Sequence, residues 1–183
     1  MDRPSLPEMI SCAASLAHHG LLKSLERLRM IDVDLGEVPT HQLVTLASCV
    51  TISLWIQNVS GCDMVAFLDS VKCRLLRIDG QKLRTEDTQA LVRAMETSVF
   101  KVYIGNYEEV TLDIEALTKY NHQGKCKYIY MAGLRYLEPE TRDKYEEALS
   151  NWPAPYPWSV RHSHLRYHLS RGFPDTDDEE SVV

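Results

Sequence analysis

Residues 73–83 read CRLLRIDGQKL, and this stretch decides the fold. Apolar Leu76 and Ile78 flank a polar residue, which is the alternation expected of a strand with one buried face. Gly80 follows two positions after Ile78, where a glycine lets the chain bend out of the strand. The stretch therefore predicts a short strand that ends at a turn.

The same pattern recurs along the chain. An apolar-x-apolar pair occurs five times, and the first members of successive pairs stand 26, 22, 26 and 27 residues apart. Recurrence of one unit at this spacing indicates a repeat architecture. The pairs are Leu28 and Met30, Leu54 and Ile56, Leu76 and Ile78, Val102 and Ile104, and Ile129 and Met131. They lie in the predicted strand runs Leu25–Leu35, Ser53–Val59, Cys73–Leu83, Val99–Val110 and Cys126–Leu137. Two residues past each pair stands a turn-forming residue: Asp32, Asn58, Gly80, Asn106 and Gly133.

Segments with helical spacing separate these runs. Thr40 is expected to cap one helix, residues 85–88 offer cap chemistry for another, and Pro139 fits the first turn of a third. A further helix, Glu8–His19, precedes the first strand. Strands joined by helical crossovers must be parallel, so the sequence predicts a parallel sheet.

The residues that alternate with the core pairs are polar, charged or aromatic. They are Arg27, Arg29, Ser53, Trp55, Arg77, Lys101, Tyr103, Tyr128 and Tyr130, with Leu75 the main apolar exception. A parallel sheet covered on both faces has strands that are apolar on both faces. We therefore expect an α/β solenoid with parallel strands on one face and helices on the other.

At this point the chain resembles a known family. The frame Leu25-x-x-Leu28-x-Met30-x-x-Val33-x-Leu35 resembles the leucine-rich repeat motif, and Cys73–Leu83 repeats it. The strand–helix alternation, over roughly residues 9–150, is similar to the ribonuclease-inhibitor type, which also forms the sensor segment of NOD-like receptors. The family usually has Asn or Cys three positions past the second core residue, where the side chain satisfies backbone groups. This chain has Val33, Val59, Gln81, Tyr107 and Leu134 there.

The resemblance divides the chain into four parts. Residues 1–24 form a helical N-terminal cap, 25–152 the leucine-rich-repeat-like array, 153–172 a C-terminal capping segment, and 173–183 an acidic tail. The tail holds five acidic residues, which account for most of the formal net charge of −6. It has no apolar periodicity, so we expect it to be disordered.

Composition argues against several functional classes. The chain has 183 residues, 44% of them hydrophobic and 25% charged, which is typical of a globular protein. No apolar run reaches the roughly 18 residues of a membrane helix, and residues 1–4 do not read as a signal peptide. We therefore expect a cytoplasmic protein. A negative net charge is unfavourable for holding nucleic acid, so a nucleic-acid partner is not expected.

Cysteines and histidines do not predict a metal site, and no cofactor is predicted. The five cysteines include no Cys-x-x-Cys pair, and His162, His164 and His168 lack a Cys or acidic partner at matching spacing. Cys73 and Cys126 occupy equivalent core-edge positions, which favours buried structural thiols. The other three, Cys12, Cys49 and Cys62, are expected on helical segments. There is neither a Gly-x-x-x-x-Gly-Lys-Ser/Thr loop nor a Gly-x-Ser-x-Gly elbow, and no catalytic residue is predicted.

The exposed strand face is the candidate binding surface. The residue between the two members of each core pair gives Arg29, Trp55, Arg77, Tyr103 and Tyr130. Trp, Tyr and Arg dominate the energetics of protein interfaces. Together with the resemblance, which implies partner binding on this face, they predict a non-catalytic protein–protein interaction module with an innate-immune or regulatory role.

Other interpretations stay open. Arg29 and Arg77 could stack on Trp55 so that the residues cover one another, or the C-terminal segment could fold over them. The chain could be a substrate-recognition adaptor of a ubiquitin ligase. A different class, an α/β enzyme or nucleotide-binding domain, would require apolar residues on both strand faces and a Gly-rich first turn, and the sequence has neither.

Overall fold

A computed structural model describes residues 5–105, 113, 115–116, 124–126, 128–132, 139–150, 159–163 and 166–170. For the strands that follow residue 127, only the backbone is described. The acidic tail 173–183, and with it the expectation of disorder, lies outside these residues.

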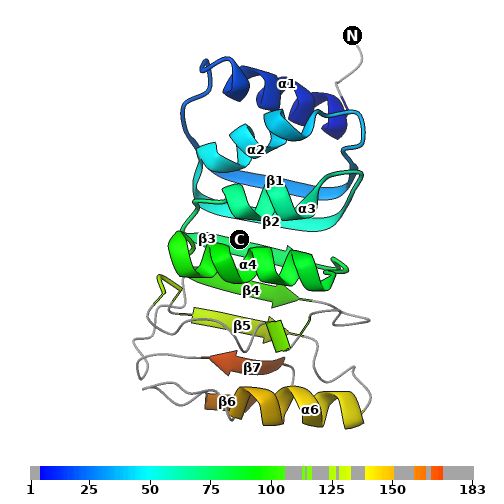
Figure 1. Cartoon of the computed structure of the whole chain (residues 1–183), viewed down its shortest axis with the longest axis vertical. Helices are drawn as coiled ribbons and strands as arrows, with labels where there is room; N and C mark the ends of the chain where they lie inside the picture. Colours follow the sequence, from blue (N-terminus) through cyan, green and yellow to red (C-terminus); the bar gives the residue numbers. More distant parts are fainter. Residues whose placement is uncertain are drawn as a thin grey trace.

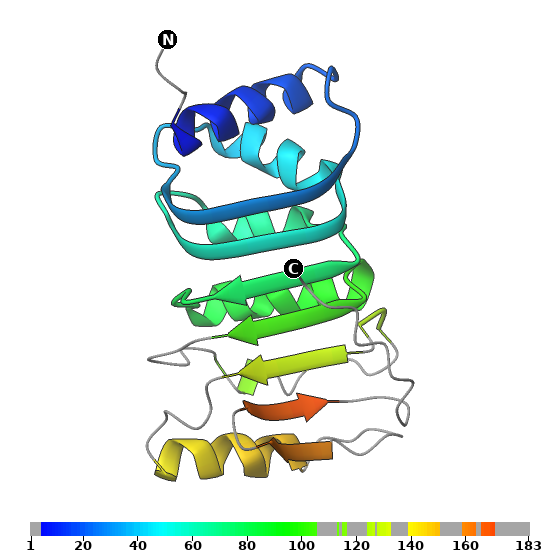
Figure 2. The same cartoon turned by 180° about the vertical axis from the view of Figure 1, so that it is seen from behind.

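The protein is an α/β structure built on a parallel sheet, as predicted. Five strands follow one another in chain order, β1-β2-β3-β4-β5, and every neighbouring pair is parallel. The strands are β1 (Leu25–Asp34), β2 (Val50–Ser60), β3 (Leu75–Asp79), β4 (Lys101–Gly105) and β5 (Tyr128–Ala132). Two further strands, β6 (Ser159–Ser163) and β7 (Arg166–Ser170), form an antiparallel hairpin whose β7 lies beside β5 in both views (Figures 1 and 2).

Helix α1 (Leu6–His18) precedes β1, and α6 (Pro139–Ser150) follows β5. Between successive strands from β1 to β4 lie α2 (Thr40–Cys49), α3 (Met64–Ser70) and α4 (Thr85–Thr97). Helices α1 to α4 stack on one face of the sheet (Figure 1), and the view from behind brings the strands to the front of these helices (Figure 2). None of the described helices is long and apolar enough to span a bilayer.

The predicted core pairs lie in register across the sheet. Leu28 pairs with Leu54, and the row continues through Leu76 and Val102 to Ile129. The second members form a parallel row: Met30, Ile56, Ile78, Ile104 and Met131. From β1 to β4 these side chains face the helices, and the largest core side chains come from both layers. Among those with less than 2% exposure are Phe67, Leu43, Leu46, Leu54, Ile56, Leu68, Leu76, Ile78, Leu91 and Met95. The period-2 alternation therefore identified the buried face correctly.

The predicted turn residues adopt the left-handed backbone that their residue types favour, but only Gly80 follows the end of its strand, because β1 continues two residues past Asp32 and β2 two residues past Asn58. Asp32, Asn58 and Gly80 have φ angles of 51°, 48° and 56°, and Asp, Asn and Gly are the residues that most readily adopt this region. The Asn58 amide donates a hydrogen bond to Asp32 Oδ1 at 2.7 Å. A Cβ at Gly80 would come within 2.6 Å of Asn58 Oδ1. The left-handed residues of successive units therefore lie next to one another; Asn106 and Gly133 lie outside the described residues.

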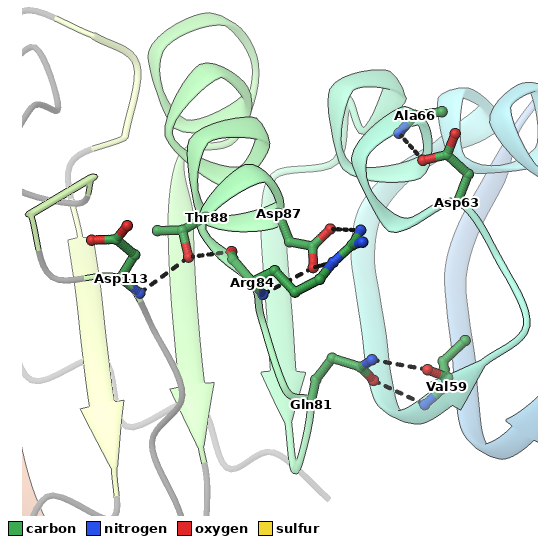
Figure 3. A network of polar contacts seen from close by, with 8 residues as sticks. All are labelled: Val59, Asp63, Ala66, Gln81, Arg84, Asp87, Thr88 and Asp113. Atoms are coloured by element: carbon green, nitrogen blue, oxygen red, sulfur yellow. Dashed lines mark hydrogen bonds and ion pairs between the residues drawn. The ribbon is translucent and has the colours of Figure 1, made fainter.

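Gln81 joins two successive units through the backbone. The Val59 N–H donates to Gln81 Oε1 at 2.9 Å, and Gln81 Nε2 donates to the Val59 carbonyl at 2.8 Å (Figure 3). Gln81 stands at the position where the resembled family usually has Asn or Cys. Its amide thus satisfies both backbone groups of Val59, which is 4% exposed.

Some local predictions were wrong. Thr40 does not cap α2: Pro39 is the N-cap residue, and its carbonyl accepts from the N–H groups of Gln42 and Leu43. Helix α1 begins at Leu6, ahead of the predicted Glu8, because Ser5 caps it. Cys62 lies before α3 and is not helical.

The cap chemistry predicted for residues 85–88 is present at the start of α4, and Asp87 provides it. Asp87 accepts from the backbone N–H of Arg84 at 2.9 Å and twice from its guanidinium at 3.0 Å (Figure 3). Burial opposes ionisation of Asp87, but these bonds hold its pKa below the ordinary value. Thr88 accepts from the N–H of Asp113 at 3.3 Å, and Asp63 caps α3 by accepting from the Ala66 N–H at 3.1 Å (Figure 3).

Candidate interface on the outer sheet face

The sheet register brings the predicted site residues into one row. Arg29 pairs with Trp55, Trp55 with Arg77, and Arg77 with Tyr103. Their neighbours in sequence point into the core, so these four side chains lie on the face away from α1–α4. We call Arg29, Trp55, Arg77 and Tyr103 the strip. The fifth predicted residue, Tyr130, pairs with Tyr103 through its backbone, and its side chain lies outside the described residues.

The strip is a stack of alternating cations and rings. The guanidinium carbons of Arg29 and Arg77 each lie 3.9 Å from the centroid of the Trp55 ring. The Arg77 guanidinium also lies 4.8 Å from the centroid of the Tyr103 ring. These distances fall within the roughly 6 Å over which a cation is attracted to an aromatic face. The mutual covering considered from the sequence is therefore present, and it fixes the orientation of the indole.

Stacking leaves part of the strip accessible. Arg29 is exposed, and Trp55, Arg77 and Tyr103 are half-buried. In the described part of the chain Arg29 has no ion-pair partner, so its donors are available to a ligand.

Asp79 is a member of this site that sequence reasoning missed. It follows Arg77 by two residues, so it lies on the same face, and it is 2% exposed. Arg77 Nε donates to Asp79 Oδ2 at 2.5 Å. Burial raises the pKa of Asp79, although the hydrogen bond and charge of Arg77 oppose this effect. The signal that could have found it is the Arg77-x-Asp79 spacing, which places two opposite charges on one strand face.

The packing around Asp79 explains how the carboxylate is accommodated. A side chain at Gly105 would clash with Asp79 Oδ1 and come within 2.9 Å of the Tyr103 ring. Asp79 Oδ1 and Trp55 Nε1 are both buried without a hydrogen bond of normal geometry, yet the indole N–H lies near enough to favour the ionised carboxylate. Asp79 therefore holds Arg77 in place between the two rings.

The described strands β1 to β4 carry equal numbers of basic and acidic side chains. The basic residues are Arg27, Arg29, Arg77 and Lys101, and the acids are Glu26, Asp32, Asp34 and Asp79. Three of the acids have described partners: Asp79 pairs with Arg77, Asp32 accepts from the Asn58 amide, and Asp34 accepts from the Gly36 N–H. Arg27 and Arg29 lie two residues apart on β1, and neither has an ion-pair partner in the described part of the chain.

A groove of about 730 Å³ lies elsewhere, between α1 and the segment that follows β1. Its acidic groups already have local roles. Glu8 closes the α1 cap by accepting from the Ser5 N–H at 2.7 Å, and Asp34 accepts from the Gly36 N–H at 3.0 Å. Glu8 also accepts from the Ser5 hydroxyl at 2.9 Å, within the same capping box. We therefore take the strip, and not this groove, as the candidate functional site.

The cysteines with equivalent core-edge positions are structural thiols, as predicted. Cys73 is 0% exposed and Cys126 2% exposed. Burial raises the pKa of Cys73 to about 12, so the reactive thiolate is suppressed at neutral pH. No cluster of three or more metal-ligating side chains occurs among the described residues. The side chains of His162 and His168 lie outside that set, and so does residue 164.

Comparisons with known proteins give this chain no relative. Neither a family model, nor a curated protein, nor a solved structure matches it. The strip is therefore the feature of this chain that bears on its function.

Proposed function

We propose that this protein is a non-catalytic protein–protein interaction module that binds its partner on the outer face of the sheet. One observation supports the proposal above all: four parallel strands present Arg29, Trp55, Arg77 and Tyr103 in a single row. With about 4.8 Å between neighbouring strands, these four residues and Tyr130 extend over roughly 19 Å. This length is comparable to that of the residue cluster that carries most of the binding energy in a protein–protein interface.

The composition and rigidity of the strip suit binding. Arg, Trp and Tyr bury a large area and keep polar groups for hydrogen bonds. The two guanidiniums already restrict the indole of Trp55, so less side-chain entropy is lost when a partner covers it. A preorganised stack of this kind binds more tightly than the same residues held loosely.

The repetition of units supports a solenoid as the architecture behind this surface. From Arg27 onward each unit adds one strand in continuous register, and Gln81 satisfies the backbone of the preceding unit as the resembled leucine-rich repeats do with Asn or Cys. We propose a leucine-rich-repeat-like solenoid on this basis. The same resemblance supports regulatory or innate-immune recognition in the cytoplasm as its role.

Comparative capture tests the proposal. The full chain and two triple variants, each with an affinity tag, are incubated with cell lysate, and the captured proteins are quantified by mass spectrometry. One variant removes the strip (Arg29→Ala, Trp55→Ala, Arg77→Ala). The matched control carries Glu86→Ala, Gln89→Ala and Arg93→Ala, which are exposed positions on α4. Circular dichroism confirms that both variants are folded.

We expect a set of proteins that the wild type and the control capture equally and that the strip variant loses at least fivefold. If both folded variants retain or lose the same proteins, the outer face is not the binding surface, and the proposal is wrong.

A further inference from the structure

We propose that the partner segment is an extended acidic peptide whose carboxylates bind Arg29 and Arg27. This inference rests on the proposed function and adds the chemistry of the partner. Charge is the first argument. The acids Asp79, Asp32 and Asp34 of the described strands already have partners. Arg27 and Arg29 are exposed, and neither has an ion-pair partner in the described part of the chain. A carboxylate of the partner is attracted to these two cations.

The second argument is the difference between the two arginines of the stack. Arg77 is committed, because it lies between two rings and its Nε donates to Asp79. Arg29 lies on one face of Trp55 and has no ion-pair partner in the described part of the chain. Its guanidinium can therefore bind a carboxylate by donating two parallel hydrogen bonds, which is the bidentate arrangement that guanidinium groups favour. Arg29 is the recognising cation, and Arg77 is a positioning residue.

The third argument is spacing. Arg27 precedes Arg29 by two residues on the same strand and is exposed, without an ion-pair partner in the described chain. Residues two apart in a strand are separated by about 6.8 Å. Two acids separated by one residue in an extended peptide have the same repeat. A peptide with an acid-x-acid pattern that runs along β1 therefore places its carboxylates opposite both arginines.

The chain itself supplies a suitable probe. Residues 173–183 read FPDTDDEESVV, in which Asp175 and Asp177 have the acid-x-acid spacing. A fluorescein-labelled peptide of this sequence serves as the acidic probe, and FPNTNNQQSVV serves as its neutral match. The protein is the full chain with Asp175→Asn, Asp177→Asn, Asp178→Asn, Glu179→Gln and Glu180→Gln, so that its own tail cannot compete for the site.

Fluorescence anisotropy measures the binding of both peptides. We expect the acidic peptide to bind at least tenfold more tightly than the neutral one, and more weakly as the salt concentration rises. Arg29→Gln and Arg27→Gln should each weaken binding about five- to tenfold, in the range of charge-assisted contacts at a partly exposed site. The matched control, Arg93→Gln, removes the same charge from α4, on the other side of the sheet, and should leave the affinity unchanged.

Three results would overturn the inference: equal affinity for the two peptides, equal loss from Arg29→Gln and Arg93→Gln, or no binding of the acidic peptide at millimolar concentration. If one of these results is obtained while the strip variant still loses its cellular partners, the acidic-peptide inference is wrong. The proposed function then stands, with a partner of other chemistry. If the strip variant still captured the cellular proteins and still bound the acidic peptide, both proposals would be wrong.

Discussion

Gln81→Ala tests how successive units are held together. Removal of this amide leaves the N–H and carbonyl of Val59 without their partners, and Val59 is 4% exposed. An unsatisfied buried polar group costs about 1–3 kcal/mol. Gln81 is half-buried, so water can replace part of the lost bonding. We expect the free energy of unfolding to fall by about 2–4 kcal/mol.

Gln57→Ala is the matched control, because the same side chain is shortened at another half-buried position. Gln57 lies on the outer face of β2 and makes no side-chain hydrogen bond in the described part of the chain. Its substitution should cost within about 0.5 kcal/mol. Urea denaturation followed by circular dichroism measures both variants. With a slope of about 2 kcal/mol per molar urea, Gln81→Ala should lower the midpoint by about 1–2 M. Equal midpoints for the two variants would refute this role of Gln81.

Three other expectations concern the core and the buried acids. Leu76→Ala should lower the unfolding free energy by about 2–5 kcal/mol, because Leu76 is fully buried. Trp55→Ala should lower it by only about 1–2 kcal/mol, because it removes two cation–π contacts. Equal melting temperatures for the two variants would contradict this order. Asp87→Asn should destabilise the chain above the ordinary aspartate pKa of 3.8, and its deficit should shrink as the pH falls through the lowered pKa of Asp87. The raised pKa of Asp79 gives stability the opposite dependence on pH. The wild type should lose stability relative to Asp79→Asn as the pH rises above 3.8. Parallel profiles of stability against pH for the two proteins would contradict this expectation.

The sequence predicted the sheet because its signal is local. The pairs Leu76 and Ile78, and their counterparts in the other units, repeat at short range, and period-2 alternation distinguishes the two faces. The left-handed backbone at Asp32, Asn58 and Gly80 follows from residue type, because few other residues adopt that backbone readily. Residue type did not predict that β1 and β2 continue past Asp32 and Asn58.

Features that depend on contacts between units could not be read in this way. Gln81 bonds Val59, 22 residues earlier, and nothing near Gln81 in the sequence indicates that partner. The predicted cap at Thr40 was wrong because cap preferences are weak: the backbone carbonyl of Pro39 served α2 without a side chain. Asp79 was missed because its surroundings belong partly to the next strand, where Gly105 leaves the space that a Cβ would take from Asp79 Oδ1. The row of site residues was found, whereas partner binding on it stays a prediction.

Site-specific photo-crosslinking in cells tests that prediction most directly. A p-benzoylphenylalanine at position 53 replaces Ser53, which pairs with Arg27 and Leu75 on the outer face beside the strip. The same group at position 89 replaces Gln89, which is exposed on α4. We expect a discrete covalent adduct with a partner protein from position 53 and none from position 89. An adduct from position 89 alone, or identical adducts from both, would contradict binding on the outer face.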